Sequence, residues 1–132
     1  MTFAKAFAGT LVAFLAIDMI WIARVVRPMY SQQVGGLLRA SPQFGAALAF
    51  YLTYAAGIVY FAVLPALDSG GVRTALVNGA ILGGLAYGTY AFTNYALLEG
   101  WTFTVAAADL GWGIVVTAAT AACGLLAARL GT

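Results

Sequence analysis

The sequence predicts an all-α, polytopic membrane protein in which four transmembrane helices form one bundle. Of its 132 residues, 64% are hydrophobic and only 8% are charged, compared with roughly a quarter charged in an ordinary soluble domain. The uncharged residues form four long runs, and a helix needs about 20 apolar residues to cross the hydrocarbon layer. We therefore expect residues 1–132 to form a single integral membrane domain.

The four spans follow from the apolar runs between charged residues, at about residues 4–23, 45–64, 75–98 and 103–128. The first run follows Lys5, as in a secretory signal. It continues through bulky residues 19–22 without a small-residue cleavage site. We expect this segment to be retained as a span.

The connecting segments are marked by proline and glycine. Residues 24–44 contain Pro28, Gly35, Gly36 and Pro42, and this composition predicts either a loop or a loop that includes a short interfacial helix. The segment after the second span, around residues 68–71, predicts a turn.

Four spans place both chain termini on one side of the membrane. Three Lys or Arg residues then lie on each side, and Arg24, Arg27 and Arg39 share one loop. The positive-inside rule favours this loop as cytoplasmic by a thin margin, which leaves dual insertion open.

Two acids lie inside predicted spans. Asp18 is five residues before the end of the first span and Asp109 is six after the start of the fourth, so both are roughly 8 Å inside the same membrane face. Asn94 on the third span reaches a similar depth. Exposing a charge to lipid costs roughly 2.5–3.5 kcal/mol on insertion scales, so we expect these side chains to face the bundle interior.

Aromatic residues surround this depth. Both acids begin the pattern Asp-x-x-Trp, and residues three apart share a helix face. The candidate binding site comprises Asp18, Trp21, Tyr51, Tyr54, Tyr90, Asn94, Asp109 and Trp112. Arg24 or Arg27 is the expected cation to pair with an acid. The alternative is structural, because Trp and Tyr also form interfacial belts and a carboxylate also joins neighbouring helices.

Four glycines on the third span predict close helix contact, and we expect this span to be central to packing. They are Gly79, Gly83, Gly84 and Gly88.

Several classes of site are disfavoured by composition. The chain has no histidine and one cysteine, Cys123, so we predict no disulfide, metal or cofactor. Six scattered basic residues against four acids do not make the basic stripe that nucleic-acid binding requires.

The sequence resembles a family of small bacterial membrane proteins, domain of unknown function 2177, over nearly its whole length. The matching residues are Asp18, Trp21, Arg27-Pro28-Met29-Tyr30, Tyr51, Tyr54, Phe61-Ala62-Val63-Leu64-Pro65-Ala66, Ala86-Tyr87-Gly88-Thr89-Tyr90, Thr93-Asn94, Gly100-Trp101, Asp109 and Trp112-Gly113.

The resemblance implies a four-helix protein of the bacterial inner membrane and no particular chemistry. Many members carry an acid where this chain has Ala91, so a mechanism with a third acid is not expected. Members are often encoded near lipid-modifying enzymes, which favours a lipid-related role by association only.

Three functions compete on these observations. The first is binding or transport of a small amphipathic or lipid-like molecule, with the acids as anchors and the aromatic residues as walls. Such a protein would contact membrane lipids and act as a homo-oligomer, and it resembles small multidrug resistance transporters in size but not in motifs. The second is an accessory subunit of a larger membrane complex. The third, a lipid-modifying enzyme with a carboxylate base and acid, is disfavoured by the lack of histidine and of an activated nucleophile.

Overall fold

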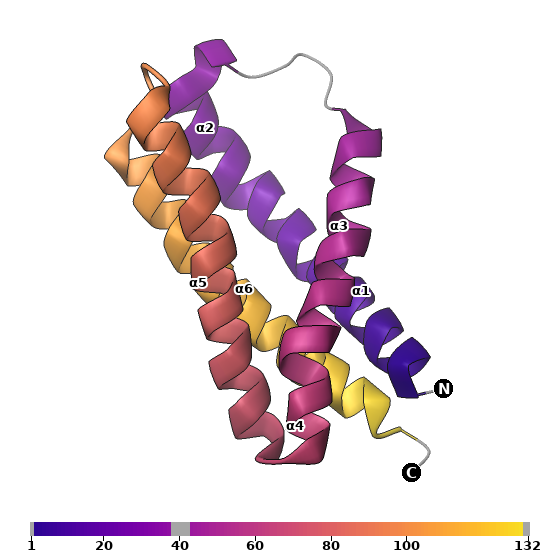
Figure 1. The fold of residues 1–132 in the computed structure, drawn as a ribbon. Helices are drawn as coiled ribbons and strands as arrows, with labels where there is room; N and C mark the ends of the chain where they lie inside the picture. Colours follow the sequence, from indigo (N-terminus) through magenta and orange to yellow (C-terminus); the bar gives the residue numbers. More distant parts are fainter. Residues whose placement is uncertain (1, 38–42, 131–132) are drawn as a thin grey trace.

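A computed structural model describes residues 2–37 and 43–130, and nearly all of this length is helical (Figure 1). The helices are α1 (Thr2–Trp21), α2 (Arg27–Val34), α3 (Phe44–Ile58), α4 (Leu64–Asp68), α5 (Gly71–Leu97) and α6 (Phe103–Ala128). Short π-helical segments join α1 to α2 (Ile22–Val26) and α3 to α4 (Val59–Val63), and a 3-10 turn, Gly35–Leu37, follows α2.

Four of the continuous helical stretches are long and apolar enough to cross a membrane: Thr2–Gln33, Gly45–Asp68, Gly71–Leu97 and Phe103–Ala128. This confirms the predicted fold class.

The central helix is α6. It packs along both α1 and α5 and also reaches α2, α3 and α4. Eleven of its residues are buried, compared with four in α5. The third span, which the glycines predicted to be central to packing, forms the most extensive contact with α6. Small residues of α6 let two neighbouring helices approach it closely, because Gly113 lies against α5 and Gly124 lies against α1.

The four predicted packing glycines, Gly79, Gly83, Gly84 and Gly88, all face α6 from α5. A Cβ atom built on Gly83 would overlap the carbonyl group of Gly113, and one on Gly79 would lie 2.9 Å from the Ala118 Cα. Added Cβ atoms on Gly84 and Gly88 would meet side chains of α6 at 3.4 Å and 3.3 Å. The contact is therefore tightest around Gly79 and Gly83.

The first helical stretch runs well beyond its predicted end. The segment predicted as a loop from residue 24 is helical as far as residue 37, and its Arg39 and Pro42 lie outside the described residues. Proline lacks an N–H group, and its ring clashes with the carbonyl four residues earlier. A π-turn just before Pro28 widens the helix there, with the Arg27 N–H donating to the Ile22 carbonyl five residues back.

The same arrangement recurs at Pro65. The Leu64 N–H donates to the Val59 carbonyl, again five residues back. The carbonyl of Phe61, four residues before the proline, accepts a hydrogen bond from Asn78 Nδ2 on α5 at 3.0 Å. A neighbouring helix thus satisfies a backbone group that proline cannot, which is how a membrane helix tolerates proline.

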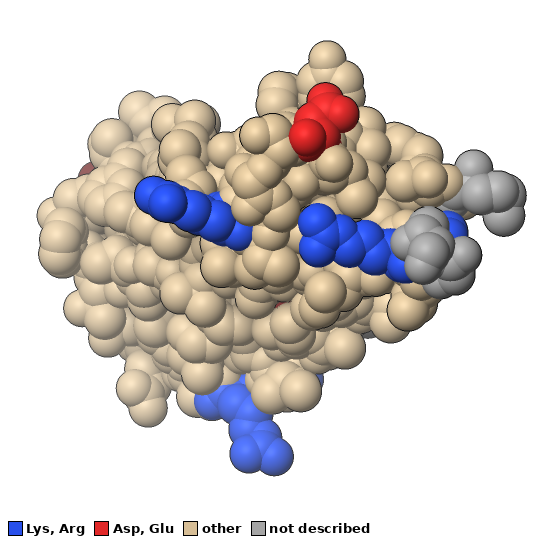
Figure 2. Space-filling model, turned by 90° about the horizontal axis from the view of Figure 1, so that it is seen from below, with Lys and Arg blue, Asp and Glu red and all other residues tan. Residues whose placement is uncertain are grey.

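The start of α1 and the end of α6 lie at the same end of the bundle (Figure 1), where Lys5 Nζ donates a hydrogen bond to the Leu130 carbonyl. Seen from that end, the basic side chains stand apart from one another on a largely uncharged surface (Figure 2).

Candidate functional site

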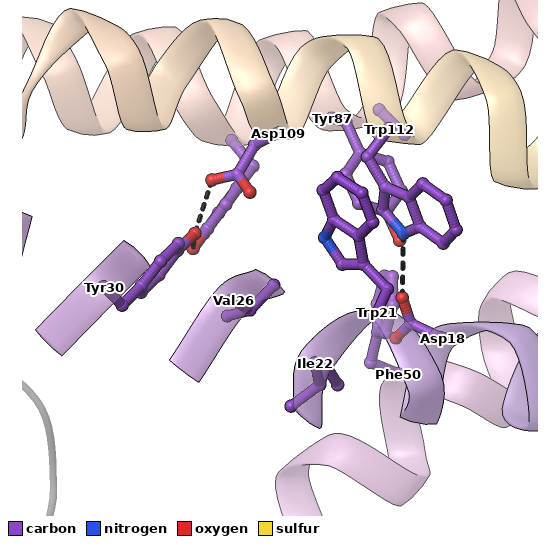
Figure 3. A pocket seen from close by; sticks show the side chains of 11 residues that line it. Asp18, Trp21, Ile22, Val26, Tyr30, Phe50, Tyr87, Asp109 and Trp112 are labelled. Atoms are coloured by element: carbon purple, nitrogen blue, oxygen red, sulfur yellow. Dashed lines mark hydrogen bonds between the residues drawn. The ribbon is translucent and has the colours of Figure 1, made fainter. Parts of the chain in front are cut away.

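A cavity of about 320 Å³ lies between α1, α2, α5 and α6, with one residue contributed by α3 (Figure 3). Its walls are mostly aromatic and aliphatic, and both intramembrane acids belong to them. The lining residues are Asp18, Trp21, Ile22, Val26, Tyr30, Phe50, Ala86, Tyr87, Tyr90, Asp109 and Trp112.

Asp18 is buried and has partners for both carboxylate oxygens. The Tyr51 hydroxyl donates to Oδ2 at 2.6 Å, and the Trp112 Nε1 donates to Oδ1 at 2.9 Å. The side chain is only 7% exposed. These two bonds join α1 to α3 and to α6, so Asp18 has a structural role in holding three helices together.

Asp109 is equally buried, at 5% exposed, but only one of its oxygens is occupied. The Tyr30 hydroxyl donates to Oδ2. The hydroxyl oxygens of Tyr30 and Tyr90 are 3.3 Å apart. Tyr90 is the donor of this hydrogen bond, because the Tyr30 hydroxyl already donates its proton to Asp109. Within the described part of the chain, Oδ1 has no hydrogen-bond partner, and it points toward the space beside Trp21 (Figure 3).

The two acids lie at opposite ends of the cavity with a stacked indole pair near Asp18 (Figure 3). The rings of Trp21 and Trp112 are 4.1 Å apart and nearly parallel, at 3°. The Trp21 Nε1 is enclosed and donates to no group in the described residues. At the Asp109 end, Trp101 packs edge-on against Tyr30 at a centroid distance of 5.5 Å.

Five of the eight predicted binding residues line this cavity: Asp18, Trp21, Tyr90, Asp109 and Trp112. Tyr51 does not line the cavity, but its hydroxyl donates a hydrogen bond to Asp18, which does. Tyr54 is in the core, where its hydroxyl pairs with Thr117 at 2.7 Å. Asn94 is half-buried and does not line the cavity.

The arginines do not pair with the acids as expected. Arg24 and Arg27 are exposed, and neither forms an ion pair with an acid in residues 2–37 and 43–130. For Arg24 the reason is spacing, because it is six residues after Asp18, whereas side chains on one helix face are three, four or seven apart. Phenol and indole groups are the donors instead.

Tyr30 is the important cavity residue that the sequence interpretation missed, because it fell in the predicted loop. Asp18, Ile22, Val26 and Tyr30 are each four residues apart. In a regular α-helix this spacing drifts away from one face. The π-turn takes in one extra residue, so the twelve steps from Asp18 to Tyr30 behave like about eleven, close to three full turns. An acid and a tyrosine at the two ends of a run of residues four apart, which crosses a proline, are the signal that would have found it.

The cavity offers one polar anchor within apolar walls. No cluster of three or more His, Cys, Asp or Glu side chains suited to a metal ion occurs in the described residues. The chemistry present is that of hydrogen bonding and charge, with Asp109 Oδ1 as the carboxylate acceptor that has bonding capacity left.

Comparison with known proteins agrees with the resemblance. The model of a family described as predicted membrane protein (DUF2177) matches residues 3–126. No curated protein and no solved structure is significantly similar to the chain. The chain therefore belongs to the domain of unknown function 2177 family of predicted membrane proteins.

Proposed function

We propose that this protein binds a small amphipathic or lipid-like molecule in the cavity between α1, α2, α5 and α6. The observation that carries the proposal is an apolar and aromatic cavity lined by a buried aspartate, Asp109, whose Oδ1 has no hydrogen-bond partner in the described residues. Small-molecule sites are typically concave and apolar with few polar groups, in the size range of roughly 300–1,000 Å³.

Transport of the bound molecule is an extension of this proposal. A chain with four spans offers few walls for a continuous pathway, so the proposal includes a homo-oligomer with membrane lipids as its surroundings. We infer an inner-membrane location because bacterial outer-membrane proteins of the barrel type span as β-strands, whereas these spans are helical. The bacterial source is carried over from the family resemblance.

The test uses the cavity's own tryptophans as reporters. 8-Bromooctan-1-ol is titrated into a Trp101→Phe variant purified in dodecyl maltoside, which leaves Trp21 and Trp112 of the cavity wall as its tryptophans, and quenching of their fluorescence is recorded. We expect a saturable component. Ala86→Phe fills the cavity from its α5 wall and should weaken this component by at least about tenfold. Ala96→Phe makes the same change at an exposed position of α5 and should leave it intact.

Equal quenching in all three proteins, or a response that never saturates, would overturn the proposal, because it would report partition into the micelle alone. In that case co-migration with other proteins on a native gel would favour the accessory-subunit function.

A further inference from the structure

The cavity has an unbalanced charge. Two acids line it, and no Lys or Arg of the described residues does. The nearest basic residues in sequence, Arg24 and Arg27, are exposed. Burying a carboxylate without a cation nearby costs free energy, because the charge loses its contact with water and gains no compensating partner. A ligand that brings a positive charge into the cavity would lower this cost.

The two acids differ in what they can offer such a ligand. Both oxygens of Asp18 already accept hydrogen bonds from Trp112 and Tyr51. Asp109 has one occupied oxygen, and its Oδ1 faces the cavity (Figure 3). A charge-assisted hydrogen bond to Oδ1 is therefore available without breaking a contact that holds the helices.

We propose that the ligand carries an ammonium head group on an apolar chain, with the ammonium bound at Asp109 Oδ1 and the chain along the stacked rings of Trp21 and Trp112. This inference rests on the proposed function, since it names the class of ligand for the same cavity. An ammonium group donates hydrogen bonds and compensates the carboxylate charge, and aromatic rings attract cations. An anionic head group would meet two acids and no cation.

Competition against 8-bromooctan-1-ol measures the head-group preference directly. The competitors share one chain length: octylamine, octan-1-ol and octanoate, in nonionic dodecyl maltoside so that no surface charge enriches one of them. Octylamine should displace the probe at a concentration that is lower than that of octan-1-ol by a factor of about ten or more. Octanoate should be the weakest competitor. Lysophosphatidylethanolamine, a lipid with an ammonium head group, tests whether the ligand comes from the membrane. Displacement of the probe by this lipid would indicate that the ligand is itself a lipid.

Variants at Asp109 then assign the preference to this residue. Asp109→Asn should bring octylamine and octan-1-ol to similar affinities, whereas Asp109→Glu, which restores the charge, should retain the preference for the amine. Loss in the first variant and rescue in the second distinguish charge recognition from a structural defect.

Octanoate competing as well as octylamine in the wild-type protein would overturn the inference while leaving amphiphile binding in place. The same holds if Asp109→Asn keeps the preference for the amine. Absence of any saturable probe binding would instead overturn the proposed function itself. The wild-type order of competitors decides the matter even if Asp109→Asn does not fold.

Discussion

At the scale of single residues, only one indole of the two Asp-x-x-Trp segments donates to an acid, and it donates to the acid of the other segment. Trp112, three residues after Asp109, donates to Asp18 rather than to its own neighbour. Trp21 stacks on Trp112 instead of donating to Asp18. The two acids thus acquire different environments from one local pattern, and Asp109 depends on Tyr30 as its donor.

This difference predicts unequal effects on stability. Asp18→Ala leaves the Trp112 N–H and the Tyr51 hydroxyl without their acceptor, and an unsatisfied buried donor costs about 1–3 kcal/mol. Asp109→Ala releases only the Tyr30 hydroxyl, which has Tyr90 beside it. We expect Asp18→Ala to lower the free energy of unfolding by about 1–3 kcal/mol more, measured by denaturation in mixed micelles. Greater destabilisation by Asp109→Ala would contradict the structural role given to Asp18.

At the scale of helices, apolar runs were enough to predict the spans, and glycine spacing was enough to predict the close contact of the third span, because both depend on local sequence. The continuation of the first helix through Pro28 was not predictable in the same way, because proline usually ends a helix. The π-turn that accommodates it, and the Asn78 amide that bonds to Phe61 near Pro65, depend on geometry and on a neighbouring helix.

The glycine contact between α5 and α6 makes a prediction at this scale. Gly83→Leu should overpack the interface and lower the free energy of unfolding by about 1–3 kcal/mol or more, because an added Cβ already overlaps the Gly113 carbonyl. Gly111→Leu is the matched control, since a Cβ there meets nothing within 4 Å. Thermal unfolding monitored in dodecyl maltoside should separate the two variants. Equal melting temperatures would show that α5 can move away from α6 at little cost.

At the scale of the whole molecule, the site depends on which helix faces meet. Periodicity placed Asp18 with Trp21, and Asp109 with Trp112, on shared faces, and these four residues do line one cavity. It could not show that α3 reaches the cavity through Phe50 while Tyr54 turns into the core. Helix spacing within one span contains no information on the crossing of two spans, so Tyr54 and Asn94 were included in the site by depth alone.

The most direct test of the account is an experimental structure of the protein with 8-bromooctylamine, in which the bromine is located by its anomalous scattering. The central claim is that the cavity is a ligand site. We predict bromine inside the cavity near Trp21 and Trp112, with the ligand nitrogen about 3 Å from Asp109 Oδ1. Bromine found only on the lipid-facing surface, with the cavity closed by its own side chains, would contradict that claim.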